Sequence, residues 1–149
     1  MADLMNEPFA FRFDRELEPV LVGGELELSG WLVQREGQPI HGIRVVIRRG
    51  IFRTRSKSAR RKRRRPEVAA AFPDLPDAWS SGFLFELRLG FGRSQLTFQV
   101  LDHERRWQTF HTTSVVCYPL TIVAGLPHTR QLLVTRMQRR LDRYRPAIP

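Results

Sequence analysis

Apolar and polar residues alternate in short runs along most of the chain before residue 118. In one such run, Ile43, Val45 and Ile47 alternate with Arg44, Val46 and Arg48. A period of two residues is typical of a β-strand with one buried face, and turn residues separate the runs. The predicted strands are 9–13, 25–33, 43–48, 83–89, 96–100 and 107–118.

Six or seven short strands separated by turns favour an all-β sandwich. We therefore predict one β-sandwich domain over residues 9–118. The turn Gly-Phe-Gly-Arg at 90–93 is short enough to join its two flanking strands as a hairpin.

One short helix is predicted inside the domain, at residues 66–72. Pro66 suits the first helical position, and Pro73 stops the helix. Val68 and Phe72 are four residues apart and would share the face that docks on the sandwich.

A second helix is predicted at the C-terminal end, over residues 126–145. Leu133, Met137 and Leu141 recur every four residues, which is the pattern of an amphipathic helix. The helix could pack on its own domain, pair with a second copy, join a partner enzyme or lie on an anionic membrane surface.

Positive charge is concentrated in two stretches of the chain. The sequence has 25 Lys and Arg against 15 Asp and Glu, a net charge of +10. Residues 53–65 hold nine cations and no acid, and residues 130–145 hold six arginines and one acid. Everything else carries a net charge of −4, so any affinity for polyanions is expected to lie in these two stretches.

The segment 53–65 has two interpretations. Clustered guanidinium groups suit phosphate binding, and RNA, DNA, anionic lipid headgroups and pyrophosphates all remain open as ligands. The alternative is a solvated inter-strand loop, because no aromatic residue is interleaved to stack on bases. The predicted anion-binding residues are Arg60, Arg61, Lys62, Arg63, Arg64 and Arg65.

No catalytic residue, cofactor or metal site is predicted. The four histidines, at positions 41, 103, 111 and 128, lack the clustered partners that zinc needs. Cys117 lies in an apolar run, where a buried inert thiol is expected. Of the three tryptophans, Trp79 is in a polar loop and is the candidate for glycan binding through its ring.

The chain is predicted to be a cytoplasmic protein. Cys117 is its only cysteine, so no intrachain disulfide can form, which fits a reducing compartment. No window approaches the roughly 18 apolar residues of a membrane span, and no signal peptide is expected at the N-terminus.

Several short motifs occur in an order that resembles a known family. They are Gly30-Trp31, the strand at 43–48, the stretch Arg-Arg-Pro-Glu-Val-Ala-Ala-Ala-Phe-Pro at 64–73, Ser-Gly-Phe at 81–83, and Arg-Trp at 106–107. This order resembles the immunoglobulin-like accessory domain found beside catalytic domains in bacterial glycosyltransferases and in sugar- or lipid-modifying methyltransferases and sulfotransferases.

The resemblance implies an immunoglobulin-like β-sandwich of about seven antiparallel strands, with residues 53–65 as an enlarged family loop. It also implies a non-catalytic accessory or interaction module in a glycosyltransferase-type system of cell-envelope polysaccharide synthesis. Its partner would be a transferase enzyme or a glycan. No transferase domain follows in this sequence, so transferase activity is not expected. A polyanion-binding protein, contacting nucleic acid or an anionic membrane through the Arg-rich loop, is the alternative.

Overall fold

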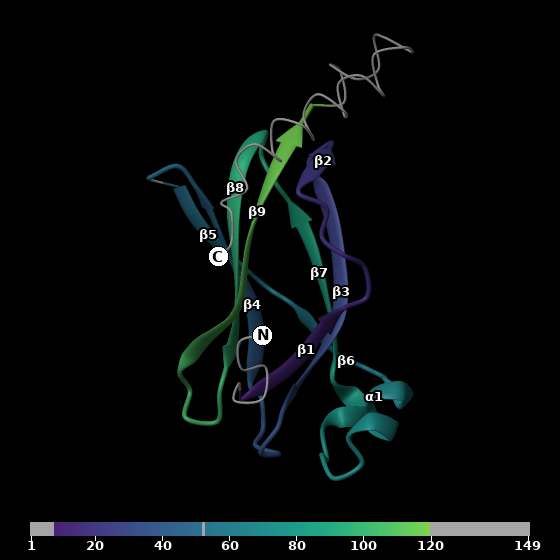
Figure 1. Cartoon of the computed structure of the whole chain (residues 1–149). Coiled ribbons are helices and arrows are strands. Elements are labelled where there is room, and N and C mark those ends of the chain that lie inside the picture. Colours follow the sequence, from purple (N-terminus) through teal and green to yellow (C-terminus); the bar gives the residue numbers. More distant parts are fainter. Residues whose placement is uncertain (1–7, 52, 120–149) are drawn as a thin grey trace, which may run out of the picture.

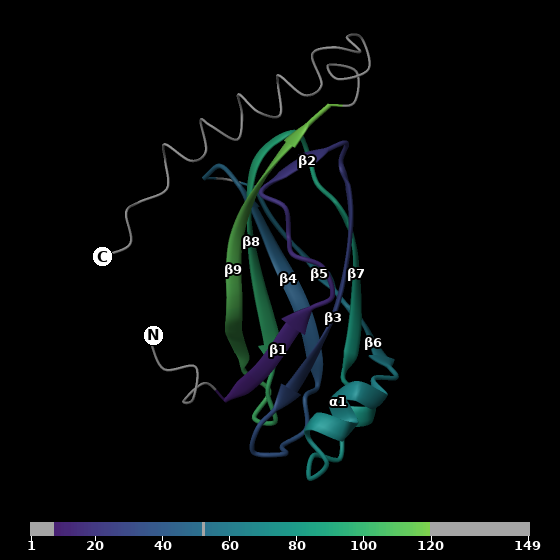
Figure 2. The ribbon, with the colours of Figure 1, turned by 45° about the vertical axis from the view of Figure 1, so that its right-hand side comes forward.

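The chain forms two β-sheets packed face to face, as the computed structural model of residues 8–51 and 53–119 shows (Figure 1). Figure 2 shows the two layers side by side, with the connections passing between them at both ends. The predicted all-β sandwich is confirmed. Sheet A contains, in spatial order, β1 (Phe9–Phe13), β3 (Glu25–Gln34), β7 (Gly82–Arg88) and β6 (Arg60–Arg63). Sheet B contains β2 (Val20–Val22), β9 (Trp107–Tyr118), β8 (Gly92–Leu101), β4 (Gly42–Arg49) and β5 (Arg53–Ser58).

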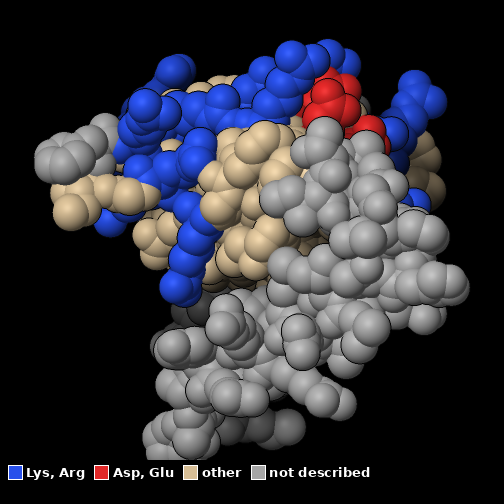
Figure 3. Space-filling view, turned by 90° about the horizontal axis from the view of Figure 1, so that it is seen from above, with Lys and Arg blue, Asp and Glu red and all other residues tan. Residues whose placement is uncertain are grey.

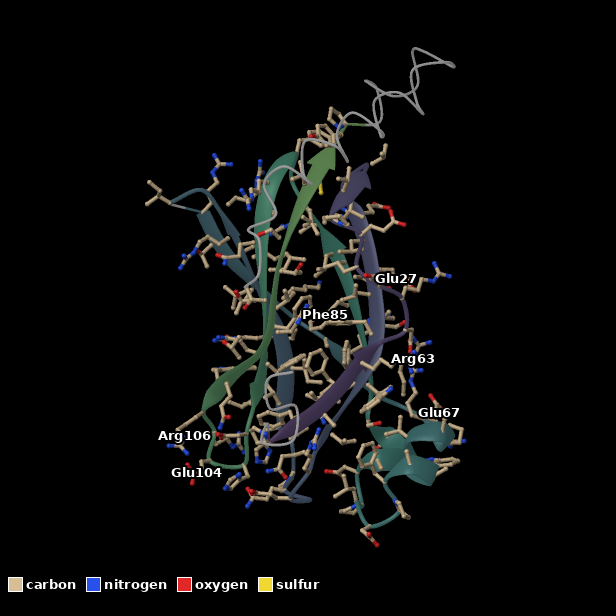
Figure 4. All side chains as sticks on the ribbon, viewed as in Figure 1. Glu27, Arg63, Glu67, Phe85, Glu104 and Arg106 are labelled. Atoms are coloured by element: carbon tan, nitrogen blue, oxygen red, sulfur yellow. The ribbon has the colours of Figure 1, made fainter. Side chains whose placement is uncertain are left out.

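The core lies between the sheets and is built from the apolar positions of the alternating runs. Phe83, Phe85 and Phe98 are completely buried, and the ring of Phe85 lies 5.6 Å from each of the other two rings. Figure 4 shows Phe85 pointing into the space between the layers. Burial of the alternate residues explains why a period of two was visible in the sequence.

The predicted helix at 66–72 is confirmed as α1 (Pro66–Ala71), which starts at its proline and ends one residue early. It is followed by a single 3-10 turn, η1 (Ala78–Ser80). Val68 and Ala78 are buried in a second apolar cluster on the outer face of sheet A, where Trp31 meets Phe72 at 6.0 Å. This cluster fixes α1 to the sandwich.

The basic segment 53–65 is not a loop, contrary to the sequence prediction. It forms two strands: β5 lies at the edge of sheet B and β6 at the edge of sheet A. The chain changes sheets at Ala59, whose N–H still donates to the carbonyl of Ile43. An edge strand needs only one hydrogen-bonded neighbour, so its side chains can all remain in water and no apolar alternation is required.

The predicted hairpin at residues 90–93 is also wrong. The strands on either side, β7 and β8, belong to different sheets, so this turn crosses the end of the sandwich. Both strands carry an apolar face, and the crossing lets each face cover the same core from opposite sides. A short turn with Gly92 at φ 94° is compatible with either arrangement, so spacing alone could not distinguish them.

Nine strands are formed by residues 8–51 and 53–119, where about seven were predicted. The additional ones include β5, β6 and the short β2, which runs parallel to β9 rather than antiparallel. The predicted helix 126–145 lies outside the described residues.

Candidate anion-binding groove

Strand β5 carries three cations on one face. Arg53, Arg55 and Lys57 alternate with hydroxyl residues, so the pleat of the strand puts all three on the same side. In the β4–β5 register, Lys57 lies opposite Val45 and Arg55 lies opposite Ile47. Because Val45 and Ile47 are core residues, the three cations lie on the core-facing side of sheet B.

These cations stay in water because sheet A ends beside them. Strand β6 pairs with β7 only at residues 82–84, so the remainder of β7 forms the edge of the described part of sheet A. All six residues of β5 are exposed. The two open strand edges, of β5 and of β7, therefore border a groove along one side of the sandwich.

The edge groove has a volume of about 790 Å³. A neighbouring depression of about 570 Å³ shares Ile47, Arg55 and Arg88 with it, so the two lie side by side. Figure 3 shows Lys and Arg side chains gathered along this side of the molecule, with a small acidic group next to them. Lining residues of the edge groove are Glu25, Leu26, Glu27, Ile47, Arg55, Ser56, Lys57, Glu86, Leu87 and Arg88.

The two walls of the edge groove differ in charge balance. On the sheet A side, Arg88 pairs with Glu25 at 3.7 Å and Arg60 pairs with Glu86 at 3.3 Å. On the sheet B side, the cations of β5 take part in none of the ion pairs formed among the described residues. The unneutralised positive charge of the groove therefore belongs to β5.

The six predicted anion-binding residues, 60–65, do not come together as one cluster. Arg61 is partly buried and donates to the carbonyl of Ile40 at 2.5 Å, and burial lowers its pKa. Arg60 is paired with Glu86, whereas Arg63 and Arg64 are exposed. The side chain of Lys62 lies outside the described residues. Whether these residues bind anions stays a prediction.

Arg65 is a structural residue. Its side chain is only 17% exposed; it contacts Asp14 at 2.5 Å and Glu67 at 3.3 Å, and it also donates to the carbonyl of Gly30. The hydrogen bond from Arg65 lowers the pKa of Asp14 and outweighs the opposing effect of burial, while the Ser29 hydroxyl, at 2.6 Å, also lowers it. Arg65 thus ties the start of α1 to β3 and to the end of β1.

We expect Arg65→Gln to lower the free energy of unfolding by about 1–3 kcal/mol at pH 7, because it breaks a partly buried ion pair. The pKa of Asp14 is lowered in the folded state, so its contribution is present above the unfolded pKa of about 3.9 and is lost as pH falls through the folded pKa. Urea unfolding of both proteins between pH 7 and pH 2 should show the difference shrinking in acid. A difference that is constant across this range would contradict the assignment to Asp14.

The three tryptophans do not form a common platform. Trp31 packs beneath α1, and Trp107 lies at sheet B with the guanidinium of Arg44 at 3.9 Å from its ring centroid. Trp79, in η1, is 50% exposed, which confirms its expected accessibility. Glycan binding by Trp79 remains a prediction.

The titratable groups closest to the core have ordinary structural roles. Burial raises the pKa of the Cys117 thiol and lowers the pKa of His111, which packs among phenylalanine rings. The buried carboxylate of Asp102 accepts hydrogen bonds from the Arg106 N–H and the Gln108 amide in the β8–β9 turn. Figure 4 shows Glu104 and Arg106 at this same end of the molecule.

Among the described residues, no three His, Cys, Asp or Glu side chains lie close enough together to hold a metal ion. Within the same part of the chain, no helix has the length and apolar character needed to cross a bilayer.

Comparisons with known proteins place the fold in context. No protein-family model and no curated protein sequence matches the chain. Similar structures include fibronectin(III)-like modules of CbhA from Clostridium thermocellum, with TM-score 0.46 and 6% identity over 76% of this chain and 48% of that one. A cycloalternan-degrading enzyme from Trueperella pyogenes gives TM-score 0.44 and 13% identity over 68% of this chain and 15% of the enzyme.

The sulfane dehydrogenase SoxCD from Paracoccus pantotrophus gives TM-score 0.38 and 20% identity over 58% of this chain and 19% of that one. The chain thus spans about half the length of the first of these structures and less than a fifth of the other two. The assignment as a β-sandwich rests on the strand pairing itself.

The predicted site residues, 60–65, do not include the cations that line the groove, at positions 55, 57 and 88, or those of the adjoining depression, at 49 and 53. A signal was present in the sequence: in Arg-Thr-Arg-Ser-Lys-Ser, cations alternate with hydroxyl residues at the period of a strand. The run at 60–65 has the higher local charge density, but charge density, unlike alternation, carries no information about which face of a strand a side chain occupies.

Proposed function

We propose that this chain is a non-catalytic interaction module that binds an anionic partner through the edge groove. The observation that supports it best is the placement of Arg53, Arg55 and Lys57 on one face of an open edge strand, without ion-pair partners among the described residues. Unneutralised cations around a concave surface favour association with carboxylates or phosphates. Edge strands also carry charge to prevent aggregation, and a binding experiment separates the two roles.

The resemblance to immunoglobulin-like accessory domains suggests the setting of this proposal. Its most specific motif, Pro-Glu-Val-Ala-Ala-Ala-Phe-Pro, contains α1, which Arg65 ties to sheet A, and Gly82 allows Arg63 of β6 to lie close against β7. By this resemblance, we propose that the partner is a transferase of envelope polysaccharide synthesis. The chain would then act in the cytoplasm, with Cys117 reduced. Co-purification of such an enzyme with the tagged chain would test this setting.

Retention on a heparin column tests the anionic contact. The variant R53S/R55S/K57S should elute at lower salt than the wild type because it removes the free cations of β5. Its matched control is R12S/R15S/R105S, which removes three exposed cations elsewhere and makes the same change in net charge.

Equal retention of the two triple variants would contradict the proposal, since net charge alone would then govern binding. Circular dichroism should show the wild-type strand signal in both variants, because all six side chains are exposed.

A further inference from the structure

Within the described part of the chain, no strand pairs with the edge of β7 that borders the groove, so its backbone groups have no ladder partner among these residues. In an antiparallel sheet, alternate residues direct their N–H and C=O to opposite neighbours. The N–H of Leu89 donates to the carbonyl of Gly24, beside β3, so the odd-numbered residues of β7 face β3. The even-numbered residues face the other way: Leu84 meets β6, and Glu86 and Arg88 face the groove.

The groove begins where the β6 ladder stops. Going backwards along β6, the last residue paired with β7 is Arg60, opposite Leu84, and the chain then crosses to sheet B at Ala59. A further strand placed beside residues 85–88 would continue this ladder. Four strand residues are about 13 Å long, which is enough for a short extended peptide.

We propose that the edge groove binds an extended acidic polypeptide segment, which adds as a strand to β7. This inference rests on the proposed function and specifies the partner of the same site. Main-chain hydrogen bonds to Glu86 and Arg88 would provide affinity, as in other strand-addition complexes. Side chains of the added strand that point toward sheet B would meet Arg55 and Lys57, so carboxylates at those alternate positions complement β5.

The groove suits a polypeptide better than a nucleic acid. Glu27 lines it together with the cations and takes part in none of the ion pairs among the described residues, so its carboxylate would repel a continuous row of phosphates. An added strand has a charge only where its sequence provides one. Its backbone also supplies partners for the N–H and C=O groups along the open edge of β7.

The probe is a blocked eight-residue peptide in which Glu and Thr alternate, with a fluorescent label. Its binding to the full chain is measured by anisotropy. Its matched control has the same sequence with N-methyl groups at alternate backbone nitrogens, which remove N–H donors and keep every carboxylate. We expect the N-methylated peptide to bind about tenfold more weakly, as the loss of one or two hydrogen bonds implies.

Two substitutions at position 86 of the protein form a matched pair. Glu86→Pro removes the N–H that faces the groove, a change that edge strands tolerate, whereas Glu86→Thr removes the same carboxylate and keeps the N–H. We expect E86P to weaken peptide binding about tenfold relative to E86T. Thermal melting checks that E86P is folded. If it is not, the N-methylated peptide tests the same strand pairing on the wild-type protein, through the bonds that peptide N–H groups donate to carbonyls of β7.

The outcomes separate this inference from the function it rests on. If R53S/R55S/K57S weakens heparin and peptide binding but N-methylation and E86P change nothing, charge alone recruits the ligand and strand addition is wrong. Tighter binding of an equally charged DNA oligonucleotide than of the peptide would also overturn it. So would sedimentation showing a dimer that E86P dissociates, because a second copy would then occupy the edge. Failure of the wild type to bind heparin would instead contradict the proposed function.

Discussion

Replacing Phe85 with alanine should lower the free energy of unfolding by about 3–5 kcal/mol, because the change leaves a large cavity in a core that cannot close around it. Phe85 has no exposed surface, and its ring packs edge to face against Phe83 in its own sheet and Phe98 in the other. It therefore contributes to the contact between the two sheets as well as to apolar burial. Urea unfolding followed by tryptophan fluorescence would measure the loss.

Phe91→Ala is the matched control for this prediction. Phe91 is 54% exposed, in the turn that crosses the end of the sandwich, and it carries the same side chain. Its removal should change the free energy of unfolding by no more than about 0.5 kcal/mol. Similar losses in the two variants would mean that the packing of Phe85 between the sheets is not as described.

Gly30→Ala should destabilise the protein by about 3 kcal/mol, near the upper end of what overpacking costs. Gly30 lies in β3 with Phe13 opposite it in β1 and Phe83 opposite it in β7. A Cβ atom at this position would lie 2.4 Å from the carbonyl oxygen of Arg12 and 2.9 Å from the Phe83 ring. The Arg12 oxygen is a backbone atom, so it cannot move without shifting β1.

Gly42→Ala provides the comparison, because it makes the same chemical change in a strand of the other sheet. A Cβ atom there would meet only side-chain atoms, at 3.5–4.0 Å, which is ordinary contact. We expect no loss, and a gain of up to about 1 kcal/mol from the reduced freedom of the unfolded chain. Thermal melting of both variants would check the opposite signs, and a Gly30→Ala variant as stable as the wild type would contradict the packing of β1 on β3.

The sequence predicted correctly those strands that bury one face. Ile43, Val45 and Ile47 alternate visibly because the core selects every second residue of β4. The helix α1 was equally predictable, since Pro66 and the four-residue spacing of Val68 and Phe72 are local signals. In both cases the residues that specify the element lie within that element or directly beside it.

Strands β5 and β6 were not predicted from the sequence, because they are stabilised by strands that are distant in the chain. Residues 53–58 are held by β4 and residues 60–63 by β7, and neither strand needs a buried side chain of its own to form. Strand β2 has three residues, and its parallel pairing with β9 joins positions almost a hundred residues apart. Such pairing depends on which strand the fold brings alongside, and a local side-chain pattern carries little information about that context.

By itself, the sequence determined that this is a β-sandwich with a short docked helix, and that its positive charge is concentrated in two places. Only the tertiary structure decided how that charge is used. The switch of the chain between sheets at Ala59 sends Arg61 and Arg65 into structural contacts and leaves Arg53, Arg55 and Lys57 beside an open groove. The physical reason is that charge depends on composition, whereas the partner of each charge depends on which strands meet, and those strands are far apart in the chain.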